Sequence, residues 1–426
     1  MSRVVVIGAG AMGLAAGYYA AKRGHAVTVL EAAPEPGGMA AHFYLGGLSI
    51  ERYYHFVCKS DQSTFDLLSE LGLGGKMRWV PTSMGYYVDG KLYPWGDPVA
   101  LLKFPKLSLL DKLRYGAMMF ISTKRSDWRS LETVSAKDWI TAWCGRGVYE
   151  RLWSPLFKLK FYEFADNISA AWIWTRIKRV GTSRRSMMQE ELGHIEGGSE
   201  TLIHALAKAI EAKGGRVVLN APASRIEDAG GRVIGVRAGG AAYPADAVIC
   251  TVPTPFVGRL VPHLPAADAA RYTAIRNIGV VCVVFRLKRS ITRHFWVNIT
   301  DARFEIPGIV EFSNLRATGD TVVYIPYYMP VTQPKFAKDD AYFRTESFNY
   351  LKLLNPQLRD DDLIACHVGR LRHAQPVCPP GFLAMLPPVE TAIGGLQIAD
   401  TCFYYPEDRG ISESVRFGKM MAERVP

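Results

Sequence analysis

The sequence lacks paired cysteines, long apolar runs and clustered metal ligands. Its seven cysteines are scattered and form no CxxC pair, which is typical of proteins in a reducing compartment. No stretch approaches the roughly 18 apolar residues of a membrane span. The first apolar run begins at Val4, so no signal peptide is expected. The nine histidines form no HxxxH pair, so no metal site is predicted, and we expect a cytoplasmic protein.

The composition indicates a soluble globular protein with an uneven charge. The chain has 426 residues, of which 49% are hydrophobic and 21% charged, which is enough for two or three domains. Residues 103–186 contain 17 Lys or Arg and 7 Asp or Glu, so they carry +10 of the net charge of +11. Such a surface attracts anionic substrates or an anionic membrane leaflet, and it is also typical of a solvated helical face. No recognition motif for nucleic acid accompanies the charge.

One basic stretch, residues 104–120, mixes apolar and basic side chains. This pattern predicts either an interfacial helix that contacts the inner face of the membrane or an ordinary core helix.

The first 31 residues have the pattern of a dinucleotide-binding unit. An apolar strand over 4–7 is followed by Gly8, Gly10 and Gly13, then by a helical stretch and a second strand that ends at Glu31. In such a unit the three glycines allow a tight turn, a close approach of the pyrophosphate, and packing of the helix on the strand. The helix N-terminus offers N–H groups to the phosphates, and Glu31 stands where an acid binds ribose hydroxyls. The alternative, a glycine-rich turn in an ordinary α/β unit, leaves Glu31 unexplained.

The residues after Glu31 indicate which dinucleotide binds. The double glycine Gly37-Gly38, followed by Met39, resembles the extended fingerprint of FAD-binding proteins of the glutathione-reductase type. The alternative is a Pro/Gly surface turn.

The order of the remaining elements predicts two interleaved domains. A helix from Ser199, strands over 216–219 and 246–253, and a final strand and helix over 396–424 resemble further pieces of the nucleotide-binding fold. We therefore expect an α/β protein with a Rossmann-like FAD-binding domain of the glutathione-reductase type, interleaved with an α+β substrate domain. The predicted FAD-binding domain comprises residues 1–80, 193–260 and 366–426. The predicted substrate domain comprises residues 81–192 and 261–365, and it includes a helical basic insertion.

The chain resembles the superfamily of FAD-dependent amine oxidases, protoporphyrinogen oxidases and phytoene desaturases. The resemblance is specific over residues 8–38, over 214–253 and over 394–415. It implies a backbone contact from Ala223 beside the adenine and a bond from Asp400 to the ribityl or phosphate region. It also implies that the helix beginning at Gly410-Ile411 lies at the pyrimidine edge of the flavin, where a helix N-terminus stabilises negative charge.

Two departures from the family bear on the activity. Amine oxidases often carry a lysine on the strand that matches residues 279–285, and this sequence has none there, which disfavours amine oxidation. Residues 51–56 resemble the histidine-rich loop of UDP-galactopyranose mutases, so His55 is predicted to lie near the isoalloxazine. The alternative for His55 is a strand histidine bonded to the backbone. The candidate catalytic residues are His55, Tyr405 and Arg409.

Three functions remain open from the sequence. The first is hydride transfer to or from a carbon of a small-molecule or lipid substrate, with a prenyl or polyprenyl phosphate favoured and its head group bound by Arg176, Arg184 and Arg185. Protoporphyrinogen oxidation is one version of it. The second is a mutase-like, non-redox reaction on a nucleotide sugar. The third is a flavin-fold binding protein without activity, which the intact fingerprints disfavour.

Overall fold

A parallel sheet of five strands holds together segments from the start, middle and end of the chain. The computed structural model describes residues 1–426. The strand order is β10 (Arg216–Val218), β2 (Ala26–Leu30), β1 (Arg3–Ile7), β14 (Ala247–Cys250) and β20 (Leu396–Ile398), and all neighbours are parallel. These strands are short apolar runs because both faces of the sheet are covered.

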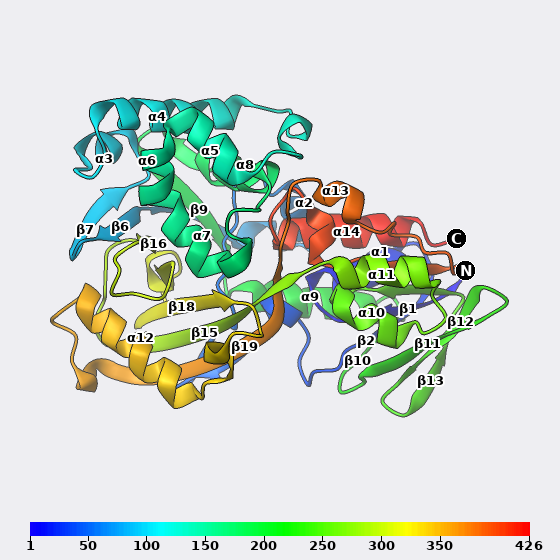
Figure 1. Cartoon of the computed structure of the whole chain (residues 1–426). Helices are drawn as coiled ribbons and strands as arrows, with labels where there is room; N and C mark the ends of the chain where they lie inside the picture. Colours follow the sequence, from blue (N-terminus) through cyan, green and yellow to red (C-terminus); the bar gives the residue numbers. More distant parts are fainter.

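Helices from the same three parts of the chain cover this sheet. Helix α1 (Ala11–Lys22) packs against α14 (Ile411–Glu423) and α9 (Ser199–Glu211). A small antiparallel sheet of β11 (Ala223–Ala229), β12 (Arg232–Ala238) and β13 (Ala241–Pro244) lies beside them (Figure 1). The two chain ends meet at this side of the molecule, where the Ser2 hydroxyl donates to the Pro426 carbonyl at 2.7 Å.

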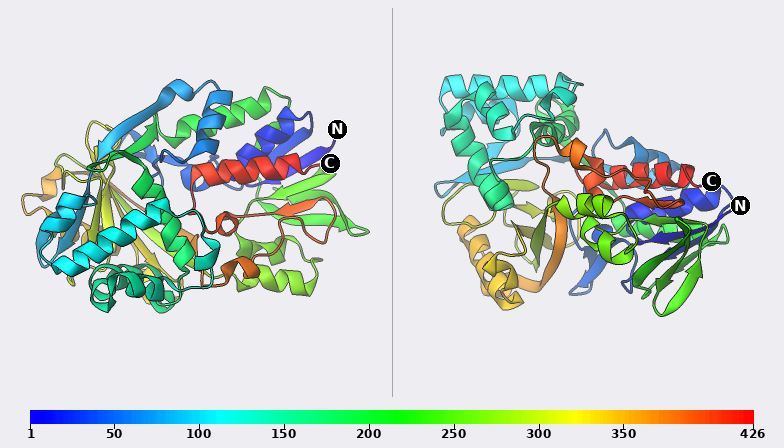
Figure 2. Two further views of the ribbon diagram at one scale, coloured as in Figure 1. Left: turned by 90° about the horizontal axis from the view of Figure 1, so that it is seen from above. Right: turned by 45° about the vertical axis from the view of Figure 1, so that its right-hand side comes forward.

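The second domain is built on a sheet of seven strands. The order is β19 (Leu363–Pro376), β15 (Asn277–Leu287), β18 (Thr321–Met329), β17 (Gly308–Glu311), β16 (Trp296–Ile299), β6 (Met84–Val88) and β7 (Lys91–Trp95). Helix α12 (Asp340–Leu354) packs on this sheet. Figure 2 shows the two sheets in separate lobes.

A group of helices completes the second lobe. It comprises α3 (Pro98–Lys103), α4 (Leu109–Lys124), α5 (Ala136–Cys144), α6 (Arg146–Val148), α7 (Ser154–Phe161) and α8 (Ala170–Thr182). Helix α4 begins with a capping box between Ser108 and Asp111. Helix α8 packs against α4, and the Trp174 indole donates to the Ser122 carbonyl at 2.9 Å. None of the helices combines the length and the apolar character needed to cross a bilayer.

The structure confirms the predicted fold class, with one α/β domain assembled from distant segments and a second domain inserted between them. The two domains are less clearly separated than the predicted boundaries imply, because two of those boundaries fall within one small sheet. Strand β9 (Gln189–Ile195) pairs with β8 (Arg184–Ser186) and with β5 (Met77–Thr82), so the cuts at 80 and 193 pass through paired strands. Residue 366 lies within β19, a strand of the second domain.

Candidate active site

The predicted dinucleotide-binding residues gather at one edge of the five-stranded sheet. Gly8 follows β1, Glu31 follows β2 and Asp400 comes soon after β20. Because these strands are parallel, their carboxyl ends share an edge, which is where open α/β sheets bind nucleotides.

Two glycines at this edge have different physical roles. A Cβ on Gly13 would lie 1.8 Å from the Gly8 carbonyl oxygen, whereas a Cβ on Gly10 would meet nothing within 4 Å. Gly13 therefore lets α1 approach β1. The space at Gly10 lies at the start of α1, whose N-terminus has no side-chain cap. Free N–H groups beside an open space fit the pyrophosphate of a dinucleotide.

The carboxylate of Glu31 is tied to the glycine turn. It accepts hydrogen bonds from the Ala9 N–H at 2.7 Å and from the Ala33 N–H at 2.9 Å. Each carboxylate oxygen retains a further acceptor position, so the predicted bond to ribose hydroxyls fits this geometry.

The residues predicted to contact other parts of the cofactor lie around this turn. The Gly37 N–H donates to the Ala9 carbonyl at 2.7 Å, and Gly38 and Met39 begin the short 3₁₀ helix that follows. The Ala221 N–H donates to the Glu31 carbonyl at 2.8 Å, which places the segment leading to Ala223 beside Glu31.

The two predicted cofactor contacts near the C-terminus differ in whether their polar groups already have hydrogen-bond partners in the protein. Helix α14 begins after Gly410, at Ile411, and has no side-chain cap, so its N–H groups are available for a ligand. Asp400 is buried, and its carboxylate accepts from the Thr254 N–H at 2.7 Å and the Cys402 N–H at 2.8 Å. Asp400 thus fixes this edge of the sheet, and its bond to the cofactor stays a prediction.

His55 lies between the two lobes with an unused ring nitrogen. Its Nδ1 is buried and has no hydrogen-bond partner. Burial, together with the nearby charges of Arg409 and Arg179, lowers the pKa of His55 to about 4 although a backbone hydrogen bond at Tyr53 opposes the shift. The imidazole is therefore neutral at pH 7, and a buried unpaired nitrogen is a group that a ligand would satisfy.

Close to His55, three basic side chains surround one carboxylate and two aromatic rings. Arg176 on α8 forms an ion pair with Asp408, and its guanidinium stands 3.8 Å from the Trp172 ring centre. Arg409 donates to the Tyr328 hydroxyl at 3.1 Å. Lys160 Nζ lies 4.8 Å from the Tyr328 ring centre and 5.2 Å from that of Trp172.

The charges in this cluster do not balance. Burial acts to raise the pKa of Asp408, but Arg176, Arg409 and Lys160 outweigh it and lower that pKa to about 2. Burial and the neighbouring Arg176 hold the pKa of Lys160 well below its ordinary value. Asp408 is therefore the one carboxylate among three basic side chains. A bound anionic ligand would reduce the repulsion between those side chains. Arg176 and Arg409 were predicted from the sequence as site residues, but Lys160 was not, because it belongs to no motif.

Three further predicted residues lie outside this cluster. The Tyr405 hydroxyl shares a 2.7 Å hydrogen bond with Ser169, and its ring packs on Trp128 and Phe382. These contacts give Tyr405 a packing role, and its catalytic role stays a prediction. Arg184 and Arg185 lie on β8, where the Arg184 guanidinium donates to three backbone carbonyls and Arg185 is exposed. No contact groups them with Arg176.

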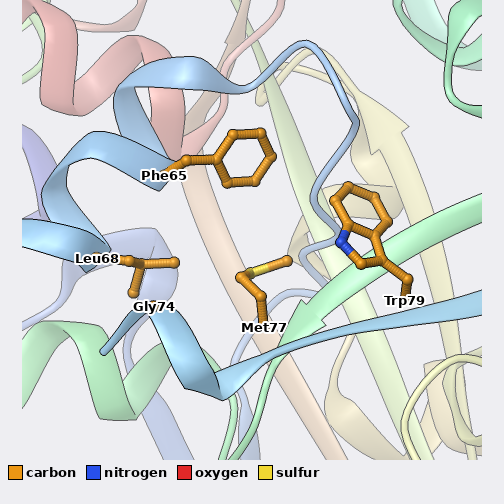
Figure 3. A pocket seen from close by; sticks show the side chains of 5 residues that line it. All are labelled: Phe65, Leu68, Gly74, Met77 and Trp79. Atoms are coloured by element: carbon orange, nitrogen blue, oxygen red, sulfur yellow. The ribbon is translucent and has the colours of Figure 1, made fainter. Parts of the chain in front are cut away.

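A surface hollow lies apart from these residues. It has a volume of about 280 Å³ and lies between α2 (Gln62–Glu70) and β5 (Figure 3). Its lining is mostly apolar: Phe65, Leu68, Gly74, Met77 and Trp79. None of the predicted cofactor or catalytic residues contributes to it.

The fold and the nucleotide edge define an FAD-binding α/β protein, and comparison with known proteins agrees. The family model of flavin containing amine oxidoreductases matches residues 13–338. A candidate protoporphyrinogen oxidase from Exiguobacterium sp. 255-15 is 20% identical, with 99% of this chain and 98% of that chain aligned and a TM-score of 0.74. Cyclohexylamine oxidase from Brevibacterium oxydans IH-35A is 18% identical, with 100% and 98% aligned and a TM-score of 0.75.

A third solved structure, a putrescine oxidase bound to putrescine, is 18% identical, with 99% and 98% aligned and a TM-score of 0.75. At these identities the solved structures show a shared fold. The family match covers most of the chain, and the chain therefore belongs to the flavin containing amine oxidoreductase family. It is an FAD-dependent oxidoreductase.

The two glycines of the turn give a test of cofactor binding. Gly10→Ala is expected to fold normally and to bind FAD at least tenfold more weakly, because its methyl group fills the space for the pyrophosphate. Gly13→Ala is expected to reduce the yield of folded protein, because its methyl group collides with the Gly8 carbonyl. Circular dichroism and FAD titration of both variants measure these effects. Tight FAD binding by Gly10→Ala would contradict the assignment.

His55 gives a test of the buried imidazole. Because its pKa is lower in the folded protein than the ordinary value near 6.5, the unfolded chain takes up the proton first as the pH falls. Stability is therefore lost between about pH 6.5 and about pH 4, by up to about 3 kcal/mol. Urea unfolding across this range should show the loss for the wild type and a smaller loss for His55→Gln. Parallel pH profiles would contradict the burial of His55.

Proposed function

We propose that this protein transfers a hydride to or from a carbon of a lipophilic substrate that carries an anionic group, and that a prenyl or polyprenyl phosphate fits best. Bound FAD supplies the two-electron chemistry. The chain's own residues bind the anion, orient the substrate and hold protons. The observation that carries the proposal is the unbalanced cluster of Lys160, Arg176 and Arg409 around the single carboxylate of Asp408.

The cluster fits the head group of such a substrate. A phosphate or diphosphate supplies negative charge that balances the three basic side chains. Hydrogen bonds between ionised groups are stronger than those between neutral groups. Arg176 is held by Asp408 and by its stacking on Trp172, so its guanidinium is already oriented. Lys160 forms no ion pair of its own and stands beside two rings.

Aromatic side chains continue from the cluster along α7. Trp172 contacts Phe161, Phe161 contacts Phe157, and Phe157 contacts Trp153, with ring centres 5.5 to 6.2 Å apart. Three of these rings, Trp172, Phe161 and Phe157, are buried, so the surroundings of the basic group are apolar, which is the environment we propose for a molecule with an anionic head and an apolar tail.

His55 is suited to proton handling beside this cluster. Its imidazole is neutral at pH 7 and its Nδ1 is unpaired, so Nδ1 can accept a proton or a hydrogen bond from a substrate. Arg409, which is fixed by Tyr328 and by the Ala374 carbonyl, disfavours a lasting positive charge on the ring.

A mutase-like reaction is the second candidate, because a nucleotide sugar also carries a diphosphate that the same cations fit. The two reactions differ in electron balance. A substrate that accepts hydride returns anaerobically reduced FAD to its oxidised absorbance in proportion to product, and one that donates hydride bleaches oxidised FAD in the same proportion. A nucleotide sugar would isomerise without any net change in flavin absorbance. Amine-dependent reduction of the flavin would contradict both proposals.

If the cluster binds the head group, removing the amine of Lys160 should weaken binding of the diphosphate but not of the uncharged alcohol. Farnesyl diphosphate should bind the FAD-loaded protein more tightly than farnesol, and Lys160→Met should weaken diphosphate binding at least tenfold without changing farnesol binding. Isothermal titration calorimetry of both proteins with each ligand measures these affinities.

The matched control is Lys178→Met, since Lys178 also stands over an indole, at 5.0 Å from Trp174, but on the side of α8 that faces Arg125. It should bind the diphosphate like the wild type. Equal losses in both variants, or no loss in either, would contradict the assignment.

We also propose that the protein meets its substrate at an anionic membrane surface. Leu109, Leu113 and Phe120 are each more than half exposed and share one face of α4, because they are spaced four and seven residues apart. Leu102 on α3 and Leu110 are also more than half exposed. Basic side chains accompany this face: Lys103, Lys112, Arg114 and Lys124. Apolar and basic groups together favour the interface of an anionic leaflet.

Vesicle sedimentation tests this membrane contact. The wild type should bind vesicles of phosphatidylserine and phosphatidylcholine and should release with added salt. Replacing Leu113 and Phe120 by Ser should weaken binding at least tenfold, because two apolar side chains no longer enter the bilayer. Ile234→Ser is the control, since Ile234 on β12 is also about half exposed. Equal binding by all three proteins would contradict the proposal.

A further inference from the structure

Two histidines and a glutamate meet where the hairpin after the glycine turn packs on α9. His42 begins β3 (His42–Leu45), and Glu200 and His204 lie one turn apart on α9. His42 Nε2 is 3.1 Å from Glu200 Oε1, and His204 Nδ1 is 3.9 Å from the same oxygen. The three candidate ligand atoms all lie within 4.8 Å of one another.

This spacing is close to that of a metal site. In a tetrahedral zinc site with bonds near 2.1 Å, neighbouring ligand atoms stand roughly 3.4 Å apart. The distances from Glu200 Oε1 to His42 Nε2 and to His204 Nδ1, 3.1 and 3.9 Å, therefore need only small side-chain movements to fit such a site. The two imidazole rings are perpendicular, with centres 5.5 Å apart, so they do not stack and their nitrogens can converge on one point.

The surroundings favour coordination over a simple ion pair. The Ser49 hydroxyl, on β4 (Leu48–Glu51), donates to Glu200 Oε2 at 2.7 Å. That bond orients the carboxylate and leaves Oε1 toward the histidines, as outer hydrogen bonds do at metal sites. The His42 side chain is 10% exposed and that of His204 is 44% exposed, so one side of the cluster remains open to water.

We propose that His42, Glu200 and His204 bind a divalent transition metal ion, with Zn²⁺ as the best match. Two imidazole nitrogens and one carboxylate are ligands that zinc accepts, with water in a fourth position. This site shares no residue with the cluster of Lys160, Arg176, Asp408 and Arg409, so it does not depend on the proposed substrate. No sequence pattern predicted this site, because His42 is far from Glu200 along the chain and the pair on α9 is Glu-xxx-His.

Such a metal would fasten the segment that follows the glycine turn. The Ser199 hydroxyl donates to the Ala40 carbonyl at 2.8 Å, and the Ser199 N–H donates to the Glu51 carboxylate at 3.1 Å. Helix α9 is thus already joined to both ends of the hairpin. Zn²⁺ would add a connection through His42, two residues after the 3₁₀ helix that contains Met39.

Zinc titration of the FAD-loaded protein, after treatment with EDTA, tests the site. Calorimetry should show one equivalent of Zn²⁺ bound, and the thermal midpoint should rise with added zinc. His42→Gln and His204→Gln should each raise the Kd at least tenfold, and Ser49→Ala should raise it about tenfold by freeing the carboxylate.

His263→Gln is the matched control, because His263 faces Asp228 at 3.0 Å without a third ligand. It should bind zinc like the wild type. Since His204 is on the surface, His204→Gln is expected to fold in any case. The proposal is overturned if His204→Gln binds zinc as tightly as the wild type, or if the wild type shows no binding up to about 100 µM zinc, near the weak end of specific affinities.

Discussion

The close approach of α1 to β1 is the contact on which the rest of the molecule depends. The approach is possible because residue 13 is glycine, since a Cβ at this position would collide with the Gly8 carbonyl. The approach brings the uncapped start of α1 to the carboxyl edge of the parallel sheet. The other strands of that edge come from the middle and the end of the chain, so a single backbone contact organises residues that are hundreds of positions apart.

The same topology explains where the second lobe contacts the nucleotide edge. The chain leaves the five-stranded sheet twice, after β2 and after β14, and its second return, at β20, comes just before α14. Asp408 and Arg409 lie at that return, and they meet Arg176 from α8 and Tyr328 from β18. The surplus of positive charge therefore sits at a junction of both lobes, close to His55. Unbalanced buried charge lowers the stability of the folded protein. Its presence at this junction therefore favours a ligand-binding site there.

Local patterns predicted the nucleotide half of the molecule well. The glycine turn, the position of Glu31 after the second strand and the strands of the parallel sheet all depend on neighbouring residues, so short sequence patterns are enough to predict them. The substrate half depends on contacts between distant segments. Lys160 on α7 reaches Tyr328 on β18, and His42 reaches Glu200, and no spacing along the chain reveals such pairs. The predicted cuts at residues 80 and 193 fall within paired strands for the same reason, since β5 and β9 pair across more than a hundred residues.

The most direct test of this account is a crystal structure of the FAD-loaded protein with a farnesyl diphosphate analogue that cannot react. The account predicts that the diphosphate lies within hydrogen-bond distance of Lys160 Nζ and of the Arg176 or Arg409 guanidinium, with the apolar chain against Trp172 or Tyr328. A diphosphate bound at the exposed Arg184 and Arg185, with the cluster of Lys160, Arg176 and Arg409 left without an anion, would contradict it.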